Sequence, residues 1–496
     1  MPTDSLFIDG KWRSSQGTDV ISVISPSTGL EIGVAADATA DDVAAAVAAA
    51  RNAFDHGSWR HLEMSERVAV VTRAADTLTQ RIDEISALVT SEMGVPITLS
   101  TAIQTRTVDS MHFLCELAFR TKLQDVRSDG GSTAVVREPV GVVASIAPWN
   151  GPFAMAVNKI VTPILAGCAV VFKPAPETPF DVAPLVDALQ AAGLPDGVLN
   201  VVTGGAATGQ ALVDSPEIDK VSFTGSTAAG RAIASVCGQN LKGVQLELGG
   251  KSAAIVLEDA DINTFRAGIS KGCFMNSGQV CVALSRVLAP RSRYDEVVQA
   301  LVAAAGDWKT GDPFDSATTL GPLVTERQRD RVESYVALGI KEGARLVTGG
   351  RRPADLDTGW FVEPTVFADV DNSMRIAREE IFGPVVVVIP YDTEADAIAM
   401  ANDSDYGLHG AVFTEDLDRA AKVAASIRTG TFSINNYVYN NRAPFGGVKA
   451  SGIGRDSGQE GFESFFELKT INLAPGMEGL YQDSSERSKT HASQTI

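Results

Sequence analysis

Two cysteines stand eight positions apart in the stretch "CFMNSGQVCVALSR", which runs from Cys273 to Arg286. A cysteine thiolate is a strong nucleophile and a good metal ligand, but an unpaired cysteine is most often a small apolar core residue. The chain has five cysteines, none in Cys-x-x-Cys spacing, and five scattered histidines, so the pattern does not favour a metal site. A nucleophile and a core residue remain the two interpretations for Cys273 and Cys281.

Seven short motifs occur in order along the chain. They are "PWN" at 148–150, "FKPAPETP" at 172–179, "FTGSTAAG" at 223–230, "ELGGKS" at 247–252, "GQVC" at 278–281, "EEIFGPV" at 379–385 and "PFGGVKASGIGR" at 444–455. As an ordered set they closely resemble the aldehyde dehydrogenase superfamily, and the resemblance extends from "LFIDGKW" to about residue 472. It implies an oxidoreductase that converts an aldehyde to a carboxylic acid with NAD(P)+.

The resemblance assigns a catalytic role to four residues. Cys281 matches the nucleophile, whose thiolate adds to the aldehyde and becomes a thioester when hydride leaves. Glu247 matches the base that activates water against this thioester, and its presence counts against the CoA-acylating branch. Asn150 matches the amide that stabilises the oxyanion, and Lys159 matches a lysine linked to proton relay near the base. Cys273 lies on the apolar side of a helical pattern and is interpreted as core.

Six further residues match cofactor contacts of the family. "GSTAAG" opens a helix with small residues, as required where a helix N-terminus approaches a pyrophosphate. Without the match, a core position would be preferred for the phenylalanine of this set. The six residues are Trp149, Lys173, Gly225, Ser226, Glu380 and Phe382.

The sequence departs from the family pattern beside Lys173. Many NAD-preferring relatives carry an acid three positions after this lysine, where it accepts hydrogen bonds from the adenosine ribose and repels a 2′-phosphate. Here the position holds Pro176, and the neighbouring Glu177 is out of register. Because no basic residue is added at this place, NAD is favoured, with NADP as the alternative.

The substrate tunnel also departs from the pattern. Positions that often hold aromatic residues are Gly151 and Asn158, and the cysteine is flanked by Val280 and Val282. Phe445 matches a tunnel aromatic of the family. These residues predict a roomy, mostly apolar tunnel for a bulky or long hydrophobic aldehyde.

Short β-rich runs alternate with helical segments through most of the chain. Helical patterns cover 39–54 and the range from Ser65 to Gly94, where glycine is suited to end a helix. β-rich runs cover 140–148, 168–174, 198–202, 220–225, 244–248, 252–257, 285–290, 385–391, 410–414 and 430–435. This alternation predicts an α/β fold with parallel sheets.

The resemblance implies three structural parts. A Rossmann-type dinucleotide-binding domain is expected over 1–120 and 140–248, and an α/β catalytic domain over 249–450, with the boundary near Gly249–Gly250. A small β oligomerisation extension is expected over 121–139 and 460–475, built from a hairpin with a Gly-Gly turn and a strand near 464–472. Family members pair through such an extension as dimers or tetramers. A polar tail covers 476–496.

The charge and composition exclude several kinds of partner. The 496 residues carry a net charge of −19, which argues against nucleic acid or an anionic membrane as a partner. No apolar run is long enough to span a membrane, no signal peptide is visible, and the odd cysteine count fits a reducing cytoplasm. Two alternatives stay open beside the dehydrogenase: a cysteine esterase or hydrolase on the same fold, and a non-catalytic binding protein.

Overall fold

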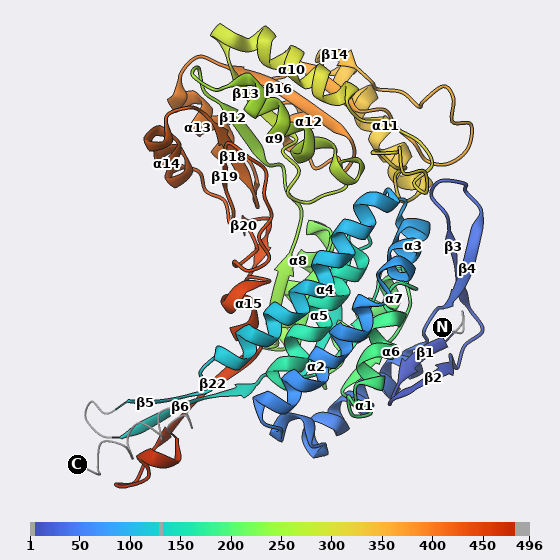
Figure 1. Cartoon of the computed structure of the whole chain (residues 1–496), viewed down its shortest axis with the longest axis vertical. Helices are drawn as coiled ribbons and strands as arrows, with labels where there is room; N and C mark the ends of the chain where they lie inside the picture. The colour runs from blue at the N-terminus through green and yellow to red at the C-terminus, as the bar shows by residue number, and fades with distance from the viewer. Residues whose placement is uncertain (1–4, 128–131, 482–496) are drawn as a thin grey trace.

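Two α/β bodies and a projecting β arm make up the computed structural model, which describes residues 5–127 and 132–481 (Figure 1). The first body contains an 8-stranded sheet and the second a 7-stranded sheet. The arm is a 3-stranded antiparallel sheet that extends away from the first body. None of the helices in the described ranges combines the length and the apolar composition of a transmembrane segment.

The first sheet has the strand order β2-β1-β9-β8-β7-β10-β11-β21. Its strands are β1 (Ser5–Ile8), β2 (Lys11–Ser14), β7 (Val142–Ile146), β8 (Ala169–Lys173), β9 (Leu199–Val201), β10 (Lys220–Thr224), β11 (Gly243–Glu247) and β21 (Gly452–Ile453). The five strands from β9 to β11 are parallel, because a helix connects each to the next in the chain.

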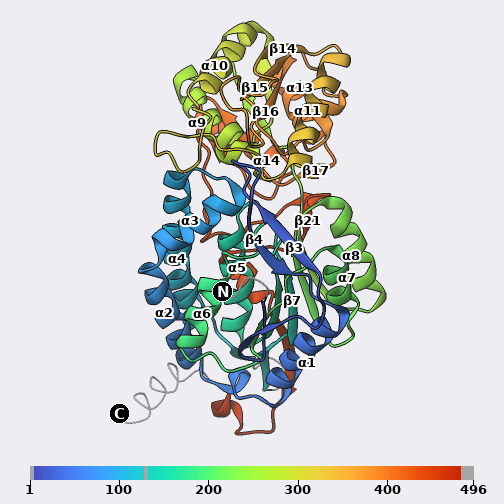
Figure 2. The same ribbon diagram turned by 90° about the vertical axis from the view of Figure 1, so that its right-hand side faces the viewer.

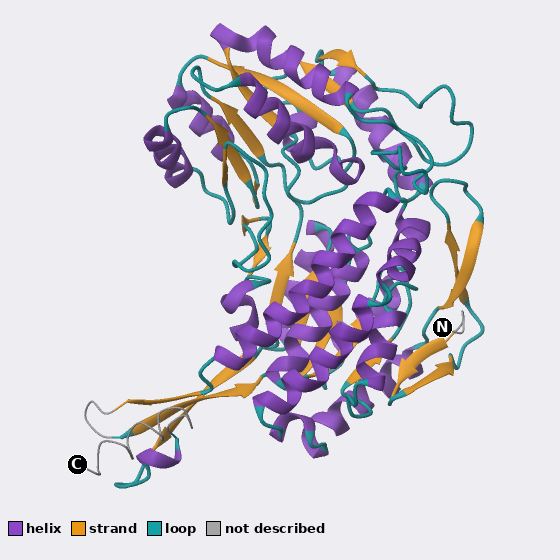
Figure 3. Ribbon diagram, in the orientation of Figure 1, coloured by secondary structure: helices purple, strands orange, loops and turns teal. Residues whose placement is uncertain are grey.

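Helices cover both faces of this sheet, as Figures 2 and 3 show. Successive residues of a strand point to opposite faces, so Phe172 packs with one helix layer and Val171 with the other. The first layer is α2 (Met64–Thr79), α3 (Ile82–Met93), α4 (Ile97–Arg120), α5 (Pro152–Ala166) and α6 (Ala183–Ala191). The second is α1 (Ala40–His56), α7 (Ala206–Asp214) and α8 (Thr227–Gln239).

The strand order reverses at β7, whose neighbours β8 and β10 continue the chain in opposite directions across the sheet. At such a switch point the loops after the carboxyl ends of the strands separate and leave a crevice. Asn150 and Ser226 lie in the segments after β7 and β10, and Lys173 and Glu247 are the last residues of β8 and β11. The fold therefore collects residues far apart in sequence at one edge.

The second sheet has the strand order β14-β15-β16-β13-β12-β18-β19, parallel except for β14. Its strands are β12 (Ala253–Val256), β13 (Arg286–Pro290), β14 (Arg345–Thr348), β15 (Thr365–Ala368), β16 (Val385–Tyr391), β18 (Gly410–Phe413) and β19 (Ser433–Ile434). One face packs against α9 (Ile262–Phe274) and α10 (Tyr294–Gly306). The other packs against α11 (Glu326–Lys341), α12 (Arg375–Arg378), α13 (Glu394–Asn402) and α14 (Leu417–Ser426).

Three small β elements complete the fold. The arm pairs β5 (Gln124–Arg127), β6 (Thr133–Pro139) and β22 (Phe466–Asn472), and its turn glycines lie outside the described residues. The two-stranded sheets are β3 (Val20–Ile24) with β4 (Glu31–Ala36), and β17 (Tyr406–Gly407) with β20 (Val448–Lys449). A short helix, α15 (Gly458–Glu463), precedes β22, and most of the predicted polar tail lies outside the described residues.

The predicted fold class is confirmed, with local corrections. The single helix expected from Ser65 to Gly94 is two helices, since the chain leaves helical hydrogen bonding at Gln80 and Arg81. Gly94 does end the second one, with φ +81°. The run 430–435 is a strand only at Ser433–Ile434. The domain limits stay a prediction, although Gly249 and Gly250 lie between the last parallel strand of one sheet and the first strand of the other.

Candidate active site

The loop that carries Cys281 begins with three consecutive residues in the left-handed region. Asn276, Ser277 and Gly278 have φ of 55°, 56° and 71°. This conformation strains non-glycine residues and is found mostly where the surrounding structure holds it for a function. Here the Ser277 hydroxyl donates to Gly321 O (2.7 Å), and the buried Gln279 amide receives a bond from Val324 N (3.0 Å). These contacts fix the approach of the chain to Cys281.

Cys281 is the one partly exposed cysteine, since the other four are buried. Its enclosed position raises the pKa of the thiol to about 12, and the carboxyl groups of Glu380 and Glu247 add to this shift. The thiol is therefore protonated at neutral pH until a positive charge comes near it. Cys273 packs in the core of the second sheet and donates to Leu284 O (2.9 Å), as predicted for a structural residue.

Asn150 lies against the cysteine loop from the end of β7. Its Nδ2 donates to Gln279 O (3.0 Å), which orients the carboxamide. Its backbone carbonyl accepts from Asn276 Nδ2 (3.0 Å), which ties the backbone of Asn150 to the same loop. An amide nitrogen has two hydrogens, so Asn150 can keep the bond to Gln279 and still donate to an oxyanion.

Glu247 ends β11 in a closed position, with 3% of its surface exposed. Neither carboxyl oxygen has a hydrogen-bond partner among the described residues. A Cβ on Gly446 (φ +147°) would lie 2.3 Å from Glu247 Oε1, so a larger residue at this position would collide with the carboxyl. Burial, and next the Asp456 carboxylate, raise the pKa of Glu247 to about 10. The group holds a proton here and becomes a base when it is solvated or meets a cation.

A buried ion pair lies beside Glu247, and sequence reasoning found only half of it. Lys159 Nζ donates to Ser222 Oγ (3.0 Å) and lies 3.6 Å from Asp456 Oδ2. Asp456 also accepts from Gln245 Nε2 on β11. Asp456 directly follows the motif "PFGGVKASGIGR", and its role depends on the turn that returns this segment to the first sheet through β21. In the sequence, an acid directly after Gly-Arg was the feature that could have identified Asp456 as a site residue.

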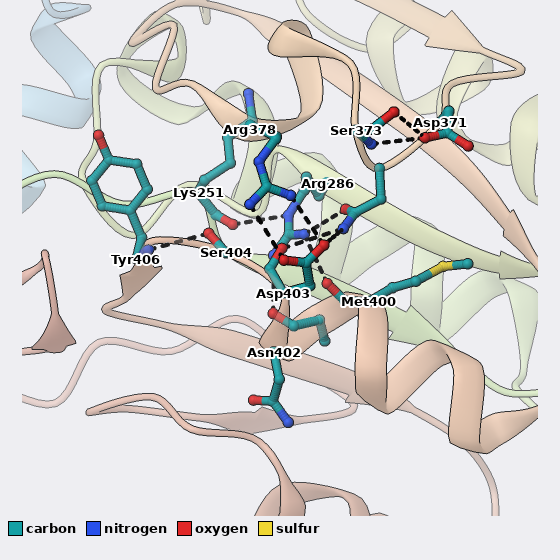
Figure 4. A network of polar contacts seen from close by, with 12 residues as sticks. Lys251, Arg286, Asp371, Ser373, Arg378, Met400, Asn402, Asp403, Ser404 and Tyr406 are labelled. Atoms are coloured by element: carbon teal, nitrogen blue, oxygen red, sulfur yellow. Dashed lines mark hydrogen bonds and ion pairs between the residues drawn. The ribbon is translucent and has the colours of Figure 1, made fainter.

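Arg286, buried at the start of β13, ties the two catalytic segments together (Figure 4). Its Nε donates to Lys251 O (3.1 Å), four residues after Glu247, and its own strand follows the Cys281 loop. The other donors bind Asn372 Oδ1 (2.8 Å) and two carbonyls at the end of α13. A Cβ on Gly250 would lie 2.3 Å from Cys281 O, so the two segments also pack directly.

The three residues predicted for the adenosine and phosphate end of a dinucleotide lie at the carboxyl ends of β8 and β10, the two strands that flank β7. Ser226 caps α8, its Oγ accepting from Ala229 N (3.3 Å), and Gly225 N donates to Glu247 O (3.0 Å). The helix N-terminus thus presents unpaired N–H groups and a positive dipole end to an anion. Lys173 is buried at the end of β8, and burial lowers its pKa to about 8.

The residues predicted for the nicotinamide end come from opposite sides of the crevice. Trp149 meets Phe382 edge to face, with ring centroids 5.3 Å apart, and Phe382 holds a strained φ of 63°. Glu380 Oε1 accepts from Gly250 N (2.9 Å), and burial raises its pKa to about 7. A small pocket is lined by Gly250, Gly278, Val280, Glu380 and Phe382 among others.

The predicted tunnel residues differ in their local surroundings. A Cβ on Gly151 would meet nothing within 4 Å, whereas Val282 is buried. Asn158 accepts from Thr162 Oγ1 (3.2 Å) and Val280 is partly exposed. Phe445 stacks edge to face on Tyr439 (5.2 Å), an aromatic residue that sequence reasoning missed. Its signal was the alternation "YVYNN" shortly before Phe445.

Comparison with known proteins shows similarity to one enzyme family over nearly the whole chain. The profile of the aldehyde dehydrogenase family matches residues 12–471. A geranial dehydrogenase from Castellaniella defragrans is 44% identical over 94% of this chain and 98% of its own length. A Mycobacterium tuberculosis aldehyde dehydrogenase solved with NAD+ has a TM-score of 0.94 and 49% identity, with 95% and 98% of the two chains covered. A Pseudomonas syringae relative solved with NAD+ and octanal has a TM-score of 0.93 and 40% identity, with 96% and 98% covered.

Proposed function

The chain belongs to the aldehyde dehydrogenase family, and we propose that it oxidises an aldehyde to the carboxylic acid with NAD+, using Cys281, Asn150 and Glu247. The observation that carries this proposal is the meeting of a partly exposed cysteine, an oriented carboxamide and an enclosed carboxyl at the switch-point crevice. Its NAD-bound structural relatives support the choice of cofactor.

The first half of the reaction takes place on Cys281. The thiolate sulfur bonds to the aldehyde carbon, and Asn150 Nδ2 donates to the oxygen that becomes negative. The thiohemiacetal then expels hydride and becomes a thioester. The bound oxidised nicotinamide supplies the hydride acceptor and a positive charge, which favours ionisation of a thiol whose pKa is otherwise about 12.

The second half is hydrolysis of the thioester. Glu247 takes a proton from water, whose oxygen bonds to the thioester carbon as the carbon–sulfur bond breaks and the proton returns to sulfur. Asp456, which is paired with Lys159, acts electrostatically on Glu247, and its carboxylate is the proposed acceptor for a proton that leaves Glu247 toward solvent. Because Lys159 is cationic, it also favours the ionised form of Glu247, opposing the effect of burial.

The six cofactor residues would contact different parts of the dinucleotide. Gly225 and Ser226 at the start of α8 fit the pyrophosphate, and Lys173 fits the adenosine ribose. Glu380 and Phe382 fit the nicotinamide ribose and ring, with Trp149 packed beside Phe382. The residues come from both sides of the crevice, so cofactor binding would join the two α/β bodies.

The substrate proposed for this site is a bulky or long hydrophobic aldehyde. Open space beside Gly151 and the aromatic pair of Tyr439 and Phe445 support it. The similarity to a geranial dehydrogenase and to a relative solved with octanal points to the same class.

The proposed assembly is a homo-oligomer, a dimer or tetramer, formed through the β arm. Among the described residues, β5 is an edge strand with one unpaired side, and Leu468 on β22 is 65% exposed. A second copy of the chain would cover both. The five unpaired cysteines support a reducing compartment, for which the cytoplasm is our proposal.

The direct test measures formation of reduced nicotinamide with NAD and with NADP across short, long-chain, aromatic and terpenoid aldehydes, with Cys281→Ala in parallel. Turnover that depends on Cys281 and favours large hydrophobic aldehydes is expected. Preference for acetaldehyde would refute the tunnel proposal. Acyl turnover that needs no nicotinamide would instead support the cysteine hydrolase.

A further inference from the structure

The loop after Lys173 contains a tight turn, and the carboxylate of Glu177 lies in this turn. Thr178 N donates to Ala175 O (3.1 Å), which closes a four-residue turn over 175–178. Proline is favoured at the second position of such a turn because its φ is already near −65°. Pro176 occupies that position, and Glu177 follows at the third. An acid absent three residues after Lys173 is thus present four residues after it, within the same reversal.

Lys173 reaches back toward this turn. Its Nζ donates to Pro174 O (3.2 Å), and its stem passes 3.7 Å from the position that a Cβ on Gly209 would take. Two carboxylates act on the ammonium, Glu177 first and then Asp37, which accepts from Gly205 N at the start of α7 (3.3 Å). The end of β8 therefore combines one buried cation with two acids.

One basic side chain reaches this place from the second body. Arg327, in the first turn of α11, lies with Nη2 3.9 Å from Glu177 Oε1. Its side chain is 89% exposed, whereas that of Glu177 is 19% exposed. This corrects the expectation that no basic residue stands near the Pro176 position, since α11 is distant in sequence. Exposure and solvent screening make Arg327 a weak partner.

We infer that Glu177, placed by the Pro176 turn, is the residue that selects NAD over NADP. Together with Lys173 it offers an acceptor and a donor to the two hydroxyls of the adenosine ribose, and it opposes the dianionic 2′-phosphate, as does Asp37. Arg327 partly offsets that repulsion, so it raises tolerance for NADP. This inference rests on the proposed function, because it assumes that the dinucleotide lies at the end of β8.

The test measures binding without any aldehyde, by titrating the full-length protein calorimetrically with ADP-ribose and with 2′-phospho-ADP-ribose. The variants are Glu177→Gln, Arg327→Gln and Glu415→Gln. The last removes the same charge from an exposed position after β18, remote in the chain from this turn, and serves as the matched control. Turnover with NAD and with NADP is measured on the same samples.

The wild type is expected to bind ADP-ribose more tightly than its 2′-phosphate. We express selectivity as the Kd of 2′-phospho-ADP-ribose divided by the Kd of ADP-ribose. In Glu177→Gln this ratio should fall by about tenfold or more, since one ribose acceptor and one repulsive charge are lost. In Arg327→Gln the ratio should rise several-fold, and Glu415→Gln should leave it unchanged. Equal ratios in Glu177→Gln and wild type would overturn the inference. A wild type that binds neither ligand would instead overturn the proposed function, which separates the two failures.

Discussion

Replacing Asp456 by asparagine should destabilise the protein by about 3 kcal/mol. Lys159 Nζ lies 3.6 Å from Asp456 Oδ2, and these side chains are only 1% and 7% exposed. At an effective dielectric constant of about 20, charges at this distance attract by about 5 kcal/mol before desolvation is counted. Removing one partner of a buried pair typically costs about 3–5 kcal/mol, because the other charge stays buried. Asparagine can still accept a hydrogen bond from Gln245, so we expect a cost at the lower end of this range.

The same change should move the pH dependence of catalysis toward lower pH. After burial, the Asp456 carboxylate is the main cause of the raised pKa of Glu247. Its loss, with Lys159 left as an uncompensated cation, lowers that pKa. At a pH below the pKa of Glu247, a larger fraction of this carboxyl is then ionised than in the wild type, so the rise of kcat with pH should begin at lower pH. The plateau of kcat should nevertheless fall, because the proton acceptor next to Lys159 is gone.

Denaturant unfolding and the pH profile of kcat test these two effects. Asp392→Asn is the matched control, since the Arg291–Asp392 pair is shorter (2.6 Å) but more than 60% exposed on both sides. It should change neither stability nor the profile measurably. Asp456→Glu keeps the charge and should keep most of the stability. Unchanged stability in Asp456→Asn, or a pH profile of kcat that moves to higher pH, would contradict the role given to the Lys159–Asp456 pair.

Three further results are expected. Asn150→Ala should lower kcat by about a hundredfold or more, measured as reduced nicotinamide, because an oxyanion donor is lost; unchanged kcat would contradict this role. Alkylation by iodoacetamide should label Cys281 before Cys273, as mapped by peptide mass spectrometry, and its rate should rise with pH up to the thiol pKa of about 12. Glu92→Gln should raise Tm more at pH 8 than at pH 5, since burial and Asp181 raise the pKa of Glu92 well above its usual value. A carboxyl with a raised folded pKa stabilises at low pH and loses that contribution as pH rises, so an equal Tm gain at both pH values would contradict this.

Local sequence patterns predicted the parallel strands and the residues at their carboxyl ends. Continuous apolar runs such as "CAVVFKP" identify buried strands, and a strand end followed by glycine or a polar residue marks a crevice position. Glu247 and Lys173 could be placed in this way because strand and loop are adjacent in sequence. The break at Gln80 was missed, because the apolar periodicity of α2 continues closely into α3.

Contacts between distant segments could not be predicted in the same way. Asp456 reaches Lys159 only because β21 pairs with β11, and Arg327 reaches Glu177 only because the two bodies face each other. The displacement of an acid by one position beside Pro176 likewise depends on turn geometry rather than on residue type. Side-chain roles that rest on such tertiary contacts require the folded structure.

The thioester mechanism is tested by intact-mass analysis of Glu247→Gln mixed with NAD+ and a long-chain aldehyde, with Cys281→Ala as control. We expect a stoichiometric burst of reduced nicotinamide, no further turnover, and an acyl group attached to Cys281. Sustained turnover by Glu247→Gln without any adduct, or the same adduct in Cys281→Ala, would contradict it.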